Sequence, residues 1–294
     1  MSGVREPDRL GSHTLRDGRR LAWAEWGPSD GGPVLLCPGA ATGRSLGFGG
    51  DDVDTLGVRL VSLDRPGLGA SDPAPGRTLT DWASDVSEVI EALELTTASG
   101  GRPSMVGFSQ GAPFALACAA AGLVSAVALV SPTDELAAPA IVELLPPQVR
   151  DLITMATTDP AAAEASFAGF ADATSMREMV TQMSGPVDRA VYTAPEFDAA
   201  YRRALAEGFA QGPAGYARDT LLSMSRWPFD PAEITVPVTL WFGAHDTNPT
   251  HSPDLGRTLA ERLPNAQRSE LPDEGGSLLW KRAGEILRGV VGAG

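Results

Sequence analysis

A pentapeptide around residue 109 constrains the fold of this chain more than any other feature of the sequence. Gly107-Phe108-Ser109-Gln110-Gly111 joins an apolar run, Ser104–Phe108, to a second apolar segment that continues to Ala121. The first has the length and composition of a buried strand, and the second those of a helix. A serine between these glycines is typical of a sharp, strained strand-to-helix turn, where a nearby Cβ would clash. An ordinary tight turn is the alternative interpretation of the bare pattern.

Strand-like runs and helical patterns alternate on both sides of this junction. An Asp17-Gly18 turn predicts an N-terminal hairpin over Ser12–Trp26. Further strands are predicted at Pro33–Cys37, Val58–Leu63, Ala126–Ser131, Val236–Phe242 and Gln267–Leu271, and further helices at Thr80–Leu95, Ser252–Leu263 and Ser277–Val291. Ser252 is expected to cap its helix, with Pro253 in the first turn. Such alternation predicts an α/β protein with a mostly parallel sheet and helices on both faces.

The alternation stops between Pro132 and about Asp230. This segment is rich in Ala, Met and Glu and is interrupted by several prolines, which predicts a set of short helices. We therefore expect residues 1–131 and 233–294 to form one α/β core, and residues 132–232 to be a helical insertion.

The charge balance restricts the partners of the chain. With 23 Lys and Arg against 37 Asp and Glu, the net charge is −14, which argues against binding to nucleic acid or to anionic membranes. No run approaches the length of a membrane span, and residues 1–8 contain no apolar leader, so a cytoplasmic location is expected. A small-molecule substrate is the expected partner, and the oligomeric state stays open.

The cysteines and histidines predict no metal site. Cys37 and Cys118 both lie in apolar contexts and are expected to be buried free thiols. No Cys/His cluster has the spacing of a zinc site, and nothing in the sequence indicates another cofactor.

With the motif around Ser109, the chain resembles the α/β-hydrolase family over nearly its whole length. The likeness is strongest to the proline iminopeptidase-like, esterase and epoxide hydrolase branches. It implies an eight-stranded, mostly parallel sheet with a helical cap supplied by the insertion. It also implies that Ser109 is the nucleophile and that Asp246, after the predicted strand Val236–Phe242, is the catalytic acid. Asp134, which follows the preceding strand, is at the other acid position that the family uses.

Two further features carry over from the resemblance. The loop Pro38-Gly39-Ala40 corresponds to the oxyanion loop, so the backbone N–H groups of Ala40 and Gln110 would form the oxyanion hole. The chain has Pro38 where the family usually has a histidine that supports this loop, which puts the loop geometry in question but not the chemistry.

The main departure from the family pattern concerns the catalytic base. The family places a histidine after the last strand, and here Gly276 occupies that place. Of the three histidines, His13 is expected to be structural, and His245 is adjacent to the acid and diverges from it. His251 follows Asp246 by five residues and could turn toward Ser109. An exposed loop histidine is the alternative. We expect Gly276 to leave an imidazole-sized gap, filled by His251, water or part of the ligand.

The insertion contains many methionines and aromatic residues, and these would supply an adaptable apolar pocket wall. Gly276, Trp227 and Met183 are the residues expected in the substrate pocket. The sequence thus predicts a serine hydrolase with Ser109, Asp246 and His251, acting on a medium-sized apolar ester, thioester or lactone. A non-hydrolytic cyclase, isomerase or lyase that uses the oxyanion hole is one alternative. A catalytically inert ligand-binding protein is another.

Overall fold

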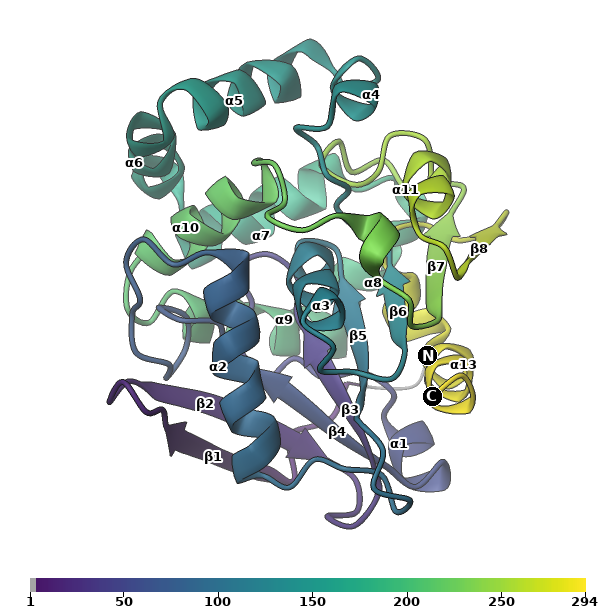
Figure 1. The fold of residues 1–294 in the computed structure, drawn as a ribbon. Helices are drawn as coiled ribbons and strands as arrows, with labels where there is room; N and C mark the ends of the chain where they lie inside the picture. Colours follow the sequence, from purple (N-terminus) through teal and green to yellow (C-terminus); the bar gives the residue numbers. More distant parts are fainter. Residues whose placement is uncertain (1–3) are drawn as a thin grey trace.

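The computed structural model describes residues 4–294, in which one mixed sheet has helices on both faces (Figure 1). The strand order is β1-β2-β4-β3-β5-β6-β7-β8. Strand β2 runs antiparallel to β1 and β4, and the other neighbours pair in parallel. The eight strands of the described chain are β1 (Arg9–Thr14), β2 (Arg20–Trp26), β3 (Gly32–Cys37), β4 (Val58–Leu63), β5 (Ser104–Phe108), β6 (Val127–Val130), β7 (Val238–Gly243) and β8 (Ala266–Leu271). The predicted α/β fold is confirmed over these residues.

The burial pattern of each strand follows from its place in the sheet. Strands β5 and β6 are buried at every residue, as expected for parallel strands covered on both faces. Edge strand β1 alternates between partly buried and exposed residues. The hairpin from β1 to β2 turns at Gly18, where φ is +88° and the N–H donates to the Leu15 carbonyl.

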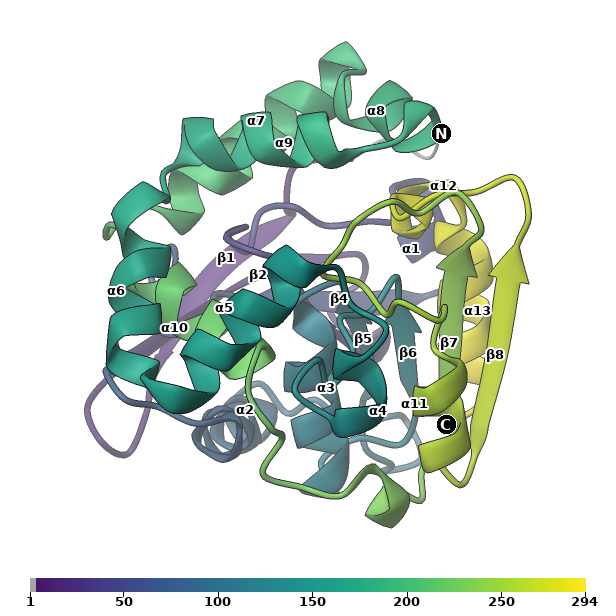
Figure 2. The same ribbon diagram turned by 90° about the horizontal axis from the view of Figure 1, so that it is seen from above.

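The strands separate the core into two layers. Leu35 and Leu36 are neighbours in β3, yet they belong to different layers because successive side chains point to opposite faces. Helices α1 (Asp51–Thr55) and α13 (Ala283–Gly292) cover the face of Leu36, and helices α2 (Leu79–Ala92), α3 (Gly111–Ala120) and α11 (Arg257–Arg262) cover the face of Leu35 (Figure 2).

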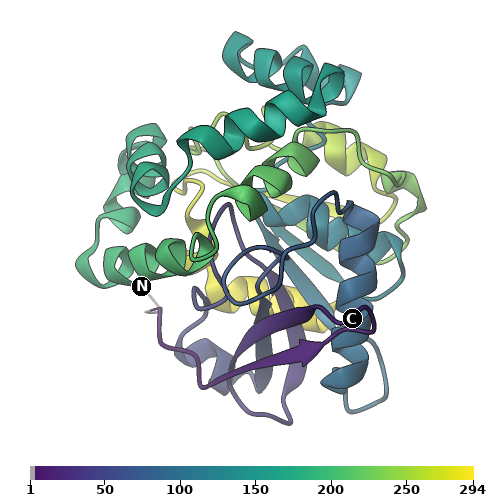
Figure 3. The same ribbon diagram turned by 90° about the vertical axis from the view of Figure 1, so that its left-hand side faces the viewer.

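Seven of the described helices lie between β6 and β7 and form a layer over the carboxyl ends of the strands (Figures 1 and 3). They are α4 (Pro139–Val142), α5 (Pro147–Thr158), α6 (Pro160–Phe170), α7 (Ala173–Met183), α8 (Pro186–Tyr192), α9 (Pro195–Gly208) and α10 (Ala214–Ser223). Five of them begin at a proline, whose missing N–H costs nothing at the first helical position. Within residues 4–294, no helix is both long enough and apolar enough to span a bilayer.

Two helix predictions differ from the structure, one in where the helix begins and one in its continuity. Helix α11 begins at Arg257, not at Ser252, because Leu255 and Gly256 both have positive φ and interrupt the helical path. The Ser252 hydroxyl accepts the Gly256 N–H within this turn. The C-terminal helix is divided at Arg282 into α12 (Leu278–Lys281) and α13. Both changes shape the loops above the carboxyl ends of β7 and β8.

Candidate active site

The turn between β5 and α3 holds Ser109 in a left-handed backbone conformation, with φ of +49°. A Cβ on Gly107 would lie 2.9 Å from the Ala115 Cβ, and one on Gly111 would lie 2.0 Å from the Cys37 carbonyl oxygen. Glycine is therefore required at both positions for helix α3 to start this close to the sheet. A non-glycine residue in this conformation stores backbone strain, which persists only where the surrounding structure enforces it.

Three side chains meet above this turn. The Ser109 Oγ lies 2.8 Å from His251 Nε2, and His251 Nδ1 lies 2.6 Å from Asp246 Oδ2. A carboxylate only accepts, so Nδ1 carries the ring hydrogen and Nε2 presents its lone pair as an acceptor for the Ser109 hydroxyl. His13, by contrast, lies in edge strand β1 and pairs with Leu21, far along the sheet from this turn. The structure thus brings Ser109, His251 and Asp246 together in a linear series of hydrogen bonds.

Asn248 shapes the loop that carries both Asp246 and His251. Its backbone N–H donates to Asp246 Oδ1 at 3.0 Å, and its Oδ1 accepts from the Thr250 N–H and hydroxyl at 3.0 and 2.8 Å. Because Oδ1 takes both Thr250 donors, the Asn248 NH2 group is turned toward His251 Nε2, at 3.1 Å. We did not identify Asn248 from the sequence. The spacing of two residues from Asp246 to Asn248 to Thr250 is typical of successive Asx turns and was the available signal.

The position of Gly276 differs from our expectation. A Cβ on Gly276 would lie 2.8 Å from Asp246 Oδ1, so the Asp246 carboxylate occupies the space beside this residue. The Gly276 N–H donates to Asp188 Oδ2 at 2.9 Å, which ties the loop after β8 to helix α8. The cavity that remains beside Gly276 has a volume of about 20 Å³. The expected imidazole-sized gap is therefore wrong, because the Asp246 carboxylate lies where a side chain at position 276 would be.

Arg65 supports the loop that was expected to form the oxyanion hole. It is fully buried and donates to the carbonyl oxygens of Pro38 at 2.7 Å and Gly39 at 3.1 Å. Its Nε pairs with Asp219 of helix α10 at 2.6 Å, and Arg77 pairs with the same carboxylate. A bidentate guanidinium therefore holds the two carbonyls before Ala40, a role that the sequence analysis did not assign. Although Pro38 stands where the family usually has a supporting histidine, the loop is supported by the buried Arg65.

Asp134, the other candidate acid, lies away from the Ser109 hydroxyl and has a different set of partners. Its Oδ2 accepts from the Ser252 hydroxyl at 2.8 Å, and its Oδ1 accepts from the Glu135 N–H at 2.7 Å. Burial raises the pKa of Asp134 to about 6, although these two hydrogen bonds oppose the change. Ser252 directly follows His251, and its N–H donates to the Pro132 carbonyl at 3.0 Å. Asp134 thus anchors the far end of the loop that carries His251.

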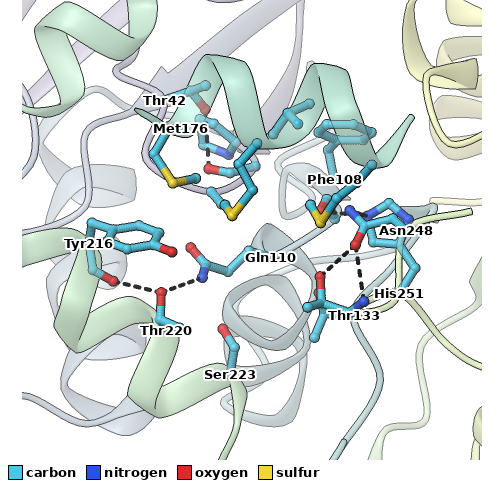
Figure 4. Close-up of a pocket in the computed structure, with 18 of the residues that line it drawn as sticks. Thr42, Phe108, Gln110, Thr133, Met176, Tyr216, Thr220, Ser223, Asn248 and His251 are labelled. Atoms are coloured by element: carbon cyan, nitrogen blue, oxygen red, sulfur yellow. Dashed lines mark hydrogen bonds between the residues drawn. The ribbon is translucent and has the colours of Figure 1, made fainter. Parts of the chain in front are cut away.

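A cavity of about 330 Å³ opens over Ser109, between the sheet and the helical layer (Figure 4). Ser109, His251, Ala40 and Gln110 all line it, as does Met183 from helix α7. Its other walls are mainly apolar: Leu36, Leu46, Phe108, Leu136, Val149, Leu152, Phe167, Phe170, Met176, Met179, Val180, Met224, Leu279 and Trp280. None of the described residues that line it is an Asp, Glu, Lys or Arg. A ligand bound there would meet no fixed ionic partner.

Two residues expected in this pocket lie elsewhere. Trp227 is buried in the core layer of α2 and α3, where its ring stacks on Phe229. The chain leaves α10 at this point and runs back toward β7, so Trp227 faces the core instead of the cavity. Gly276 lines only the small neighbouring cavity, because Asp246 separates it from the larger one.

The buried thiols take no part in this site. Cys37 and Cys118 are both free and buried. Burial raises the pKa of the Cys37 thiol to about 12 and also raises the pKa of Cys118, so both stay protonated near neutral pH.

The fold and this arrangement of residues define an α/β hydrolase, and comparison with known families agrees. The model of the alpha/beta hydrolase family matches residues 34–287, so the chain belongs to that family. Over 94 residues the chain is also 34% identical to a non-heme chloroperoxidase from Streptomyces lividans. This match covers 29% of the chain and 32% of that relative, so it extends over about a third of either protein.

Solved structures share the fold over nearly the whole chain. A hydrolase from Pseudomonas aeruginosa PA01 superposes with a TM-score of 0.68 at 21% identity, covering 97% of this chain and 99% of the other. The enol-lactonase from Burkholderia xenovorans LB400 gives a TM-score of 0.67 at 20% identity, with 96% and 98% covered. An esterase from Rhodococcus sp. ECU1013 gives 0.63 at 20% identity, with both chains fully covered. At these identities the likeness concerns the fold alone.

Proposed function

We propose that this protein is a serine hydrolase that cleaves an uncharged, medium-sized ester or lactone through an acyl-enzyme on Ser109. The observation that carries the proposal is the series of hydrogen bonds from Ser109 through His251 to Asp246, at 2.8 and 2.6 Å. A nucleophile, a base and an orienting carboxylate at these distances are the parts that acyl transfer requires.

In the first half of the reaction, His251 Nε2 takes the hydroxyl proton as Ser109 Oγ attacks the substrate carbonyl carbon. The carbonyl oxygen becomes an oxyanion, which the N–H groups of Ala40 and Gln110 stabilise in this proposal. Asp246 accepts from Nδ1–H throughout and stabilises the imidazolium. The C–O bond to the leaving alcohol then breaks, and His251 donates its proton to that oxygen. The product is an ester of Ser109 with the acyl group.

In the second half, a water molecule gives a proton to His251 and attacks the acyl-enzyme. The second tetrahedral intermediate collapses, the bond to Ser109 Oγ breaks, and the proton returns to the serine. The carboxylic acid product then leaves.

The cavity supports the choice of substrate. Its lining is largely apolar and contains no described Asp, Glu, Lys or Arg, so a charged substrate would lose hydration without gaining a partner. A volume of about 330 Å³ suits a medium-sized molecule. Two proteins that share the fold are named an esterase and an enol-lactonase, and a lactone is a cyclic ester. The strained backbone of Ser109 further favours an enzyme over an inert binding protein, which has no use for it.

The test is active-site labelling combined with kinetics. A fluorophosphonate probe should add one label to the protein by intact mass, and Ser109→Ala should abolish it. With p-nitrophenyl esters of short and medium acids, His251→Ala should lower kcat by about 10³-fold or more. His13→Ala is the matched control and should retain parental turnover. A parent protein that resists the probe and hydrolyses no ester would overturn the proposal.

A further inference from the structure

Helix α10 presents a polar stripe to a mainly apolar cavity. Tyr216, Thr220 and Ser223 line the cavity and follow one another at helical spacing on the same face of the helix. The Gln110 carboxamide extends toward them from the turn that carries Ser109 (Figure 4). These four residues form what we call the polar wall. His251 and Asn248 lie on the opposite side of the same view.

The hydrogen bonds of the polar wall fix the orientation of Gln110. The Thr220 hydroxyl donates to the Tyr216 carbonyl at 2.9 Å, so its only hydrogen is in use. Thr220 Oγ1 therefore acts as an acceptor toward Gln110, and Gln110 Nε2 donates to it at 3.1 Å. This places the carboxamide nitrogen against α10 and leaves Oε1 on the other side of the group.

Gln110 Oε1 has no hydrogen-bond partner, although only 7% of the residue is exposed. A buried carbonyl oxygen without a donor is costly, and such groups in native proteins require an explanation. The Ser223 hydroxyl donates to the Asp219 carbonyl at 2.8 Å, so toward the cavity Ser223 Oγ can act only as an acceptor. The polar wall thus offers two acceptor atoms, Gln110 Oε1 and Ser223 Oγ, and no residue of the wall donates a hydrogen bond to either of them.

The polar wall is held in place from behind. Asp219, between Thr220 and Tyr216 on α10, is fully buried and pairs with Arg65 and Arg77. The pairing fixes α10 against the loop before Ala40. The acceptors of the polar wall are therefore presented on a rigid element, which favours a recognition role.

We propose that the polar wall is a specificity subsite for a neutral hydrogen-bond donor, a hydroxyl or an amide N–H, on the acyl part of the substrate. This inference rests on the proposed function. The leaving alcohol must lie against His251, which gives it a proton, so the polar wall, which lies across from His251 in Figure 4, faces the acyl group. An ammonium donor does not fit, because none of the described lining residues is an Asp or Glu.

The test compares p-nitrophenyl hexanoate with its 3-hydroxy, 6-hydroxy, 3-methoxy and 6-methoxy derivatives. The leaving group stays the same, and each methoxy ester keeps the oxygen but lacks the hydrogen. In the parent protein, kcat/KM for at least one hydroxy ester should exceed that for its methoxy partner by about tenfold or more. A site built to pair with a donor rejects the analogue without one, because its acceptor is then left unpaired.

Gln110→Met should abolish this hydroxy-to-methoxy preference, because the side chain keeps its length and loses its acceptor. The ratio is the readout, so a change in folded fraction or in oxyanion binding cancels. Gln148→Met is the matched control: Gln148 also lines the cavity, but it lies outside the polar wall, and its substitution should leave the ratio unchanged. Equal ratios in the parent and in the double variant Gln110→Met/Ser223→Ala, which removes both acceptors, would overturn the subsite.

A binding measurement separates the subsite from the hydrolytic function. In Ser109→Ala, the melting temperature should rise more with ethyl 3- or 6-hydroxyhexanoate than with the methoxy analogue, and Gln110→Met in that background should remove the difference. If no ester is hydrolysed but this difference persists, the proposed reaction fails and the subsite stands. If the parent hydrolyses every ester but neither readout distinguishes the hydroxyl, the subsite fails and the reaction stands.

Discussion

The Asp246 carboxylate lies against Gly276, with Oδ1 only 2.8 Å from where a Cβ on that residue would be. The residue that the family usually reserves for its histidine thus has no room for a side chain. The Asp246 carboxylate occupies this space, and from there its Oδ2 reaches His251 Nδ1, on the same loop, at 2.6 Å. The position of His251 and the glycine at 276 are two parts of one arrangement.

Gly276→His should therefore lower activity instead of restoring a conventional base. Any Cβ at 276 must displace Asp246 or the loop, and a displacement of about 1 Å in a catalytic group costs up to roughly 10²-fold. We expect Gly276→Ala and Gly276→His each to reduce kcat for p-nitrophenyl esters by about tenfold to a hundredfold. Gly169→Ala is the control, since no atom lies within 4 Å of its added Cβ. Faster hydrolysis by Gly276→His in a His251→Ala background would show that the new ring serves as the base.

Asn248→Ala should reduce kcat by about tenfold to a hundredfold, with a smaller effect on KM. The substitution removes the turn that Oδ1 makes with Thr250 and the N–H donor at His251 Nε2. Asn248→Asp retains the oxygen that accepts from Thr250 but loses the NH2 group that faces His251 Nε2. It therefore separates the effect of the turn from the effect of the contact with the ring. Asn265→Ala removes an exposed side chain whose amide donates to the Thr235 carbonyl, and it should change neither constant. Parental kcat in Asn248→Ala would mean that Asp246 alone positions the ring.

Deprotonation of Asp134 should lower the free energy of unfolding as the pH rises from about 4 to above 6. Burial raises the pKa of Asp134 from 3.8 to about 6, so the folded protein binds this proton more tightly than the unfolded chain. The stabilisation is complete below pH 4 and is lost as pH increases through the folded pKa, with a size of about 3 kcal/mol. Urea unfolding of the parent and Asp134→Asn across this range should reveal the difference in slope. Ser252→Ala removes a hydrogen bond that lowers this pKa, so it should move the transition to higher pH. Identical slopes for the parent and Asp134→Asn would contradict the prediction.

Arg65→Met should destabilise the protein by about 3–5 kcal/mol in the free energy of unfolding. It removes a buried partner of Asp219 and leaves the Pro38 and Gly39 carbonyls without their donors. The exposed pair of Arg16 with Glu91 provides the control, and Arg16→Met should cost less than about 1 kcal/mol. Denaturant titration of both variants gives the comparison. Similar losses in the two variants would mean that Arg65 does not support the loop.

Local patterns were sufficient for the class of fold and for the turn that carries Ser109. Strand β5, the glycines at 107 and 111 and helix α3 are adjacent in sequence, and their conformations follow from hydrophobicity and from the freedom of glycine. The alternation of strands and helices likewise predicted the mostly parallel sheet, because parallel strands need helical crossovers. Helix α11 was misplaced because Ser252 resembles an N-cap, whereas the positive φ of Leu255 and Gly256 delays the helix to Arg257.

The sequence alone therefore determined the family of fold, the turn at Ser109 and the candidates for acid and base. Only the tertiary structure decided that His251 reaches Ser109, that Asp246 fills the place beside Gly276 and that Arg65 supports the loop before Ala40. Each of these depends on groups brought together from distant parts of the chain. The Asp188 carboxylate on α8 and the Gly276 N–H after β8 are another such pair. Hydrophobic periodicity records which face of an element is buried. It carries no information on which polar groups will meet once the elements have packed.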